Sequence, residues 1–223
     1  MKSWASDTVL GANRRQSLIR VGLAVVLLGG LLWALPSRRP GEGGHHAEHA
    51  APLDPFERAG ITELREGQHG SAFTLRWLDG RSTTLGELTR DRLVVLNFWA
   101  TWCQPCTVEM PTLEALWGRY RERGLVVAGI SVDRGAPRAL LDPYVRSLKL
   151  TFPILLDPEM KTANAWRVTS LPATFVIRPG GEVAGFAIGP RDWDSAEMRS
   201  LLEPMLPRQH GGGSGEAMST PHR

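Results

Sequence analysis

Cysteine is scarce in this chain of 223 residues, which contains only Cys103 and Cys106. No third cysteine remains to form a structural disulfide elsewhere or to complete a four-thiolate metal site. A bridge between the two residues would enclose almost no loop, so it would restrict the unfolded chain very little. The scarcity therefore favours a redox role for the pair over a structural disulfide or half of a zinc site.

Long basic runs are missing as well. Lys and Arg number 26 against 23 Asp and Glu, the net charge is +3, and the basic residues are scattered along the sequence. Scattered charges are typical of a solvated surface, whereas nucleic-acid binding needs a basic stripe or patch. The sequence therefore predicts no nucleic-acid partner, and its composition of 42% hydrophobic and 22% charged residues is that of a globular protein.

The longest apolar run, from Val21 to Leu35, is short for a bilayer span, which needs roughly 20 apolar residues. It indicates either a cleaved signal peptide or an uncleaved anchor over 21–36, and we favour the anchor because no small-x-small cleavage site follows. Basic residues are more numerous before the run, in 1–20, than after it, which predicts a cytoplasmic N-terminal segment. The chain is thus expected to cross the inner (cytoplasmic) membrane once, with its folded domain on the periplasmic side.

Low-complexity segments are expected on both sides of that domain. Residues 37–60 predict a flexible linker rich in Gly, Pro, Ala and His, and residues 208–223 predict a disordered tail. The linker contains His45, His46 and His49, which are either a chance cluster or a loose copper or zinc site. Because a metal site needs preorganised ligands, no metal or cofactor is assigned.

Within the predicted domain, 61–207, apolar runs of strand length alternate with helical patterns. The turn Asp79-Gly80 indicates a hairpin between the first two strands, and Asp192 or Asp194 is expected to cap the last helix. The alternation predicts an α/β fold with a mixed central sheet flanked by helices. Strand patterns lie at 72–78, 82–85, 93–99, 125–132, 154–156, 173–177 and 182–188, and helical patterns at 103–123, 136–148, 161–166 and 192–206.

The motif Cys103-Gln104-Pro105-Cys106 lies where a buried strand is expected to end and a helix to begin. The first turn of a helix presents unpaired N–H groups and the positive end of the helix dipole, and both stabilise a thiolate. A free cysteine has a pKa near about 8.5, and C-x-x-C cysteines in such positions have values of roughly 3.5–7. We predict that Cys103 attacks a disulfide and that Cys106, one turn further along, resolves the mixed disulfide. Trp102 is expected to belong to a partly exposed apolar rim that receives a protein partner.

Residues 93–111, which read LVVLNFWATWCQPCTVEMP, and residues 171–177, which read LPATFVI, carry a family resemblance. They resemble the TlpA-like branch of the thioredoxin superfamily, which includes ResA and CcmG. The resemblance implies a thioredoxin-like fold with an additional N-terminal hairpin and a central insertion. It also implies a membrane-anchored, exported thiol–disulfide oxidoreductase that works as a protein-disulfide reductase.

Three further residues acquire roles through this resemblance. Pro172 matches the cis-proline that faces the dithiol, and the backbone of Leu171 would pair with an extended substrate like an added strand. Glu109 matches an acidic residue that tunes the thiols. A buried carboxylate there, with a raised pKa, could exchange a proton with Cys106, whereas a solvated helix glutamate is the alternative.

Two positions depart from related patterns. Cytosolic thioredoxins carry a buried aspartate where Asn97 stands, so a proton role falls to Glu109 or to water. CcmG-type proteins usually carry a glutamate where Ala173 stands, so the residues support the general reductase assignment more strongly than one specific to cytochrome c maturation.

The expected clients, by resemblance, are proteins with disulfides in cytochrome c maturation or copper-site assembly. An exported enzyme lacks the cytosolic thiol pool, so a membrane electron donor of the thiol-transfer type is expected as a second partner. Two alternatives stay open. One is a copper-binding chaperone that uses the dithiol and the histidine cluster, and the other is a disulfide oxidase or isomerase.

Overall fold

The computed structural model describes residues 53–135 and 137–208. The predicted segment 1–20, the anchor 21–36, His45, His46 and His49 lie outside this range, as does the tail from residue 209 on. None of the helices in the described part is long and apolar enough to cross a membrane.

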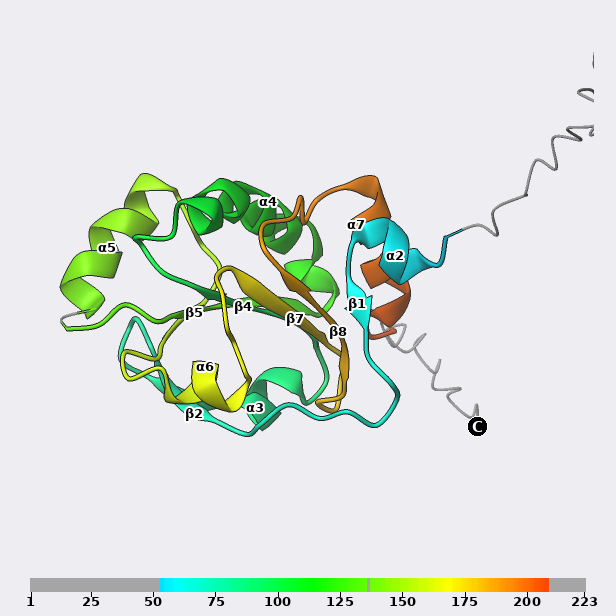
Figure 1. Cartoon of the computed structure of the whole chain (residues 1–223), viewed down its shortest axis with the longest axis horizontal. Coiled ribbons are helices and arrows are strands. Elements are labelled where there is room, and N and C mark those ends of the chain that lie inside the picture. The colour runs from blue at the N-terminus through cyan, green and yellow to red at the C-terminus, as the bar shows by residue number, and fades with distance from the viewer. Residues whose placement is uncertain (1–52, 136, 209–223) are drawn as a thin grey trace, which may run out of the picture. The chain divides into compact units, whose positions relative to one another are not determined.

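The described residues form one mixed sheet of eight strands with helices on both faces, which confirms the predicted α/β fold (Figure 1). The strand order is β1-β8-β7-β4-β5-β6-β2-β3. The strands are β1 (Thr62–Glu63), β2 (Thr74–Trp77), β3 (Ser82–Thr84), β4 (Leu93–Trp99), β5 (Leu125–Ser131), β6 (Ile154–Leu156), β7 (Ala173–Ile177) and β8 (Val183–Ile188). The α-helices are α2 (Pro55–Ala59), α3 (Leu85–Thr89), α4 (Gln104–Tyr120), α5 (Pro137–Ser147), α6 (Lys161–Ala165) and α7 (Ala196–Leu202), and two 3-10 turns follow α4 and α7 at Arg121–Arg123 and Glu203–Met205.

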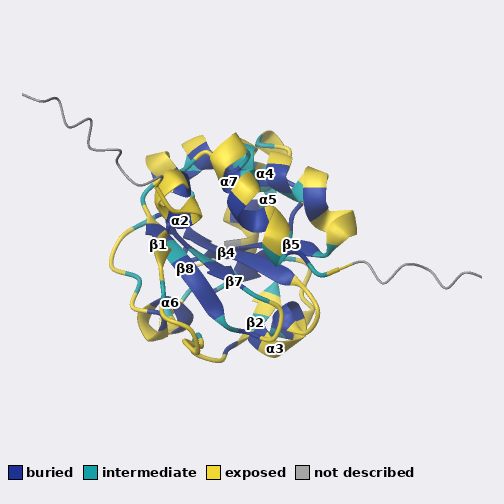
Figure 2. Ribbon diagram, turned by 90° about the vertical axis from the view of Figure 1, so that its right-hand side faces the viewer, coloured by how far each residue is buried: buried dark blue, intermediate teal, exposed yellow. Residues whose placement is uncertain are grey.

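The centre of the sheet is formed by β4 and β5, which run parallel with Leu93 opposite Leu125 and Trp99 opposite Ser131. Every residue of both strands is buried, as their continuous apolar runs predicted (Figure 2). Both views place α4, α5 and α7 on one face of the sheet and α3 and α6 on the other. The core strand β4 therefore ends beneath the start of α4, and this junction positions the dithiol.

Two predicted boundaries differ from the structure. The end of the expected linker is helical: Asp54 caps α2 by accepting hydrogen bonds from the backbone N–H groups of Phe56 and Glu57, and Phe56 is buried. The last helix begins later than expected, because Ser195 is its N-cap and accepts from the Met198 N–H at 3.2 Å. The expectation that Asp192 or Asp194 caps this helix is therefore wrong.

Asp194 has a different partner. Its carboxylate accepts two hydrogen bonds from the Arg119 guanidinium of α4, at 3.0 and 3.2 Å, and forms an ion pair with Arg199. This tertiary contact removes Asp194 from the role that its sequence position suggested. It also ties α4 to the segment that precedes α7.

Candidate active site

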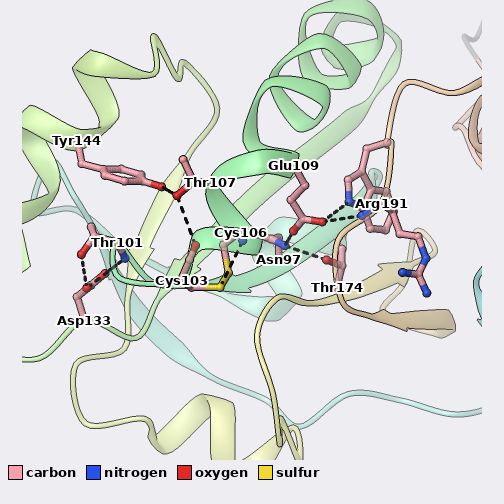
Figure 3. Close-up of a disulfide and its surroundings, with 11 residues drawn as sticks. Asn97, Thr101, Cys103, Cys106, Thr107, Glu109, Asp133, Tyr144, Thr174 and Arg191 are labelled. Atoms are coloured by element: carbon pink, nitrogen blue, oxygen red, sulfur yellow. Dashed lines mark hydrogen bonds between the residues drawn. A yellow bond between two sulfur atoms is a disulfide. The ribbon is translucent and has the colours of Figure 1, made fainter.

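The disulfide between Cys103 and Cys106 lies at the carboxyl end of β4, where α4 begins (Figure 3). Cys103 is the N-cap of α4: its backbone is extended, and its Sγ atom accepts a hydrogen bond from the Cys106 backbone N–H at 3.3 Å. Pro105 occupies the first turn of α4. Backbone N–H groups in a first turn have no partner within the helix, so the N–H that proline lacks costs no helical hydrogen bond. Such a helix start can stabilise negative charge on the Cys103 sulfur.

The surroundings of the two cysteines differ in exposure. Cys103 is 6% exposed and Cys106 is fully buried. Cys103 lies on a groove of about 570 Å³, whose apolar lining includes Trp102, Met160 and Val168. Trp102 is 71% exposed, so the rim of the groove presents a large apolar side chain to solvent. Attack from outside can therefore reach Cys103 but not Cys106.

The second wall of the groove is formed by the segment before β7. The peptide bond between Leu171 and Pro172 is cis, as the family resemblance implied, and Leu171 lines the groove. Among the described residues, no hydrogen bond engages the backbone of Leu171. Its N–H and C=O groups are thus free to pair with an extended polypeptide.

Glu109 lies in the core and not at the solvated helix surface, which decides between the two expectations for this residue. It is 1% exposed, and its carboxylate accepts hydrogen bonds from the Arg191 backbone N–H and the Trp193 indole N–H, both at 3.1 Å. Burial raises the pKa of Glu109 to about 7, and the N–H donors and the charge of Arg191 oppose that rise. Glu109 can therefore gain or lose a proton near neutral pH.

Asn97, on β4, connects Glu109 to the next strand. Its Nδ2 group donates to Glu109 Oε1 at 2.7 Å and to Thr174 Oγ1 at 2.8 Å (Figure 3). All three side chains are at most 1% exposed. The sequence singled out Asn97 only as a group that cannot titrate, and gave no sign that Thr174 or Trp193 would meet it at one site.

A second buried carboxylate, Asp133, holds the turn before Cys103. It follows β5 and accepts hydrogen bonds from the Thr101 backbone N–H at 3.0 Å, the Thr101 hydroxyl at 2.7 Å and the Ser131 hydroxyl at 2.9 Å. Sequence reasoning missed Asp133. An acidic residue directly after a buried strand, parallel to the strand that leads into the motif, was the signal that could have found it.

A hydroxyl pair links α5 to the start of α4. Tyr144 and Thr107 share a hydrogen bond of 2.7 Å, and the Thr107 hydroxyl also donates to the Cys103 carbonyl at 3.4 Å. The Tyr144 ring stacks on Trp99, with 5.2 Å between the ring centroids. Trp99 is fully buried and packs in the core.

No group of three or more His, Cys, Asp or Glu side chains in the described ranges could hold a metal ion. The sulfurs of Cys103 and Cys106 are bonded to each other as a disulfide. The two sulfurs and the Glu109 carboxyl are groups of the described site that can exchange electrons or protons.

A disulfide-forming C-x-x-C pair at a helix start, beside a cis-proline and on a mixed sheet, defines the thioredoxin-fold class of thiol–disulfide exchange proteins. Residues 67–186 match the model of the AhpC/TSA family. The chain is similar to the thiol-disulfide oxidoreductase ResA of Geobacillus thermodenitrificans, with 35% identity over 146 residues that cover 66% of this chain and 81% of ResA. The chain therefore belongs to the AhpC/TSA family and, within it, to the TlpA-like proteins that include ResA.

Other relatives agree with this placement. ResA of Bacillus subtilis is 30% identical over 131 residues, covering 59% of this chain and 72% of ResA. A thiol:disulfide interchange protein of the thioredoxin family from Chlorobium tepidum superposes with a TM-score of 0.53 at 25% identity, covering 62% of this chain and 99% of that chain. A DsbF homologue from Corynebacterium diphtheriae shares the fold, with a TM-score of 0.56, 23% identity, and coverage of 65% of this chain and 92% of that chain. The chain is thus a thiol–disulfide oxidoreductase.

Proposed function

We propose that this protein is a membrane-tethered, extracytoplasmic reductase that opens disulfides in client proteins. The observation that carries the proposal is the placement of the dithiol: Cys103 lies on an open apolar groove, whereas Cys106 is fully buried behind it. The apolar run over 21–36 supports an anchor, with residues 1–20 in the cytoplasm and the rest of the chain exported. Residues 61–207 would be the catalytic domain, joined to the anchor by the linker that precedes it.

The reaction begins with both cysteines reduced. The Cys103 thiolate attacks one sulfur of the client disulfide, forming a Cys103–client bond and releasing the other client sulfur as a thiol after protonation. Cys106 then loses its proton and attacks the Cys103 sulfur. The Cys103–Cys106 bond forms, the Cys103–client bond breaks, and two electrons have passed to the client.

Glu109 is proposed as the base that takes the proton from Cys106 in the second step. It lies one helical turn after Cys106 and has a pKa of about 7, so it is partly ionised at neutral pH. Trp102 and Leu171 would bind the client, the first through its exposed indole and the second through its free backbone groups. Pro172 would hold Leu171 in this position.

The oxidised protein needs electrons before it can act again. Because the exported compartment lacks a reducing thiol pool, a membrane donor of the thiol-transfer type is proposed. The proposed clients are apocytochrome c, with its haem-binding cysteines, or proteins of copper-site assembly, as the family resemblance implies. The dithiol would act on either kind of client by the same two steps.

The direction of exchange is tested by the reduction potential of the Cys103–Cys106 couple in the full-length protein. A reductase is expected to have a potential near thioredoxin's, about −270 mV, whereas a value near about −120 mV would identify an oxidant and overturn the proposal. The parallel assay follows reduction of an apocytochrome c peptide that carries an internal disulfide. The Cys103→Ser variant should show no reduction above the uncatalysed rate.

A further inference from the structure

One polar atom at the floor of the active site has no partner. Asn97 is fully buried, and among the described residues nothing donates a hydrogen bond to its Oδ1 atom. The Nδ2 group of the same amide already donates to Glu109 and Thr174. The reverse orientation of the amide would place Oδ1 against the ionised Glu109 carboxylate, so ionisation of Glu109 favours the orientation in which Nδ2 donates to it.

The Asn97 amide packs against the first turns of α4, because it donates to Glu109, which lies one helical turn after Cys106. Side chains of an α-helix lean toward its N-terminus, so Glu109 covers the turn that starts at Cys106. Asn97 contacts the Glu109 carboxylate from below, and Figure 3 draws it between Cys106 and Thr174. Glu109 and Thr174 therefore hold the Nδ2 end of the amide, whereas its Oδ1 end is unpaired among the described residues and belongs to a side chain that packs on the helix that carries Cys106.

Reduction of the disulfide creates a new donor at this place. In the disulfide, Cys106 has no hydrogen on its sulfur, and in the reduced protein it has an S–H group that is shielded from water. A buried donor is normally paired with an acceptor, and a buried acceptor with a donor. The unpaired oxygen of Asn97 and the new thiol hydrogen of Cys106 satisfy each other.

We propose that Asn97 Oδ1 accepts a hydrogen bond from the Cys106 thiol in the reduced protein, so that one amide holds Cys106 and Glu109 together. Asn97 is then a positioning residue: it keeps the proton on Cys106 until a client is bound and keeps the base at a fixed place beside it. The inference deepens the proposed function, on which it rests for the cycle between thiol and disulfide.

The other charged and titratable groups near the site face different atoms. Arg191, in the connection before α7, donates its backbone N–H to the Glu109 carboxylate, whereas its guanidinium donates to the carbonyls of Gly60 and Pro190. Asp133, after β5, is engaged by Thr101, and Tyr144 of α5 is engaged by Thr107. Asn97, on β4, is thus the uncharged side chain that we propose to link Glu109 to Cys106.

The test uses the full chain with Cys103→Ser, which leaves Cys106 as its one thiol. The infrared S–H stretching band then reports Cys106 alone, and it moves to lower frequency when the thiol donates a hydrogen bond. Asn97→Leu should move the band to higher frequency, because the acceptor is lost. The matched control, Thr174→Val, removes a partner of Nδ2 but leaves Oδ1 in place, so the band should not move.

The proposal would be overturned if the S–H band had the same frequency in the Cys103→Ser protein and in the Cys103→Ser protein that also carries Asn97→Leu. Should the Leu variant fail to fold, Asn97→Val serves instead, because its β-branched side chain suits a strand and also lacks the acceptor, so the frequency should again rise. A band that does not move on Asn97→Val equally overturns the proposal. Neither spectrum depends on turnover, so failure here is distinguishable from failure of the reductase assay.

The pH titration of the Cys106 thiolate, followed by its ultraviolet absorbance, gives a second readout in the same background and needs no reagent to enter the core. A hydrogen bond donated by the neutral thiol opposes its ionisation, so Asn97→Leu should lower the midpoint of this titration by about one pH unit. Thr174→Val should leave the midpoint within a few tenths of a unit. A midpoint that moves equally in both variants would indicate a general packing effect and overturn the specific role of Asn97.

Discussion

The two sides of the dithiol differ in almost every physical respect. On the side of Cys103 there is an open groove with Trp102 71% exposed and a wall whose backbone groups at Leu171 are unpaired. On the side of Cys106, Asn97 and Glu109 are at most 1% exposed and their polar atoms are almost fully paired. The Cys103 side is open to contact with a client, and the Cys106 side buries a carboxyl group that can hold a proton.

The comparison indicates that capture of the client and control of the proton are separated in space, although the two sulfurs are bonded to each other. A thiolate that lines an open groove must accept clients of many sequences, and apolar contact and backbone pairing do not depend on the client's sequence. A proton held near neutral pH requires a site closed to water, since solvation would return the carboxyl to its ordinary pKa. Four experiments separate these two roles, in order of expected effect.

Removal of the buried thiol should have the largest effect. Cys106→Ser keeps the attacking Cys103 but lacks the group that releases the client, so the client should accumulate as a stable mixed disulfide with Cys103. Non-reducing electrophoresis and mass spectrometry of the trapped complex measure this. The Cys103→Ser protein is the control and should trap nothing; trapping through Cys106 would reverse the assignment of open and closed sides.

Loss of the buried carboxyl should slow the resolving step. Glu109→Gln keeps the size of the side chain but cannot accept a proton, and general bases contribute typically about a hundredfold or more. The rate of client release should therefore fall about a hundredfold, measured by stopped-flow after formation of the mixed disulfide. In the unmodified protein the rate should rise with pH through about 7, where Glu109 ionises. An inflection of equal size in the Gln variant would assign it to another group.

Loss of the exposed indole should affect binding more than chemistry. Trp102→Ala removes a large apolar side chain from the rim of the groove, and aromatic anchors at interfaces are commonly worth about 2 kcal/mol. The KM for a disulfide-containing client should rise roughly 30-fold while kcat changes little. Leu53→Ala, at another exposed apolar residue that does not line the groove, is the control and should leave KM unchanged.

Stability should show the smallest effect at each step, at most about 1.4 kcal/mol for each pH unit. The folded protein keeps a proton on Glu109 up to about pH 7, whereas the unfolded chain loses it near 4.5, so the native state binds more protons between these values. The free energy of unfolding should therefore fall as the pH rises from 4.5 to 7, by at most about 3 kcal/mol. Urea unfolding across this range should show a shallower pH slope for Glu109→Gln. Parallel slopes for the two proteins would mean that Glu109 has an ordinary pKa.

Much of the fold followed from local patterns. The apolar runs predicted β4 and β5, the turn Asp79-Gly80 predicted the hairpin of β2 and β3, and the strand–helix junction predicted the place of the dithiol. Each depends on neighbouring residues, because strand periodicity, turn chemistry and helix starts act over a few positions. The short elements β1, α2 and α3 were missed. Each has at most five residues, which is too few to show a strand or helix periodicity, and each depends on a capping residue or on pairing with a neighbouring strand.

By itself, the sequence determined that two cysteines would meet at a helix tip, because three residues of helix bring them together whatever else the chain does. Only the tertiary structure decided their surroundings. Trp193 reaches Glu109 across 84 positions of sequence, Thr174 reaches Asn97 across 77, and Asp133 reaches Thr101 across 32. The burial that raises the pKa of Glu109 arises from this packing, and no local pattern contains it.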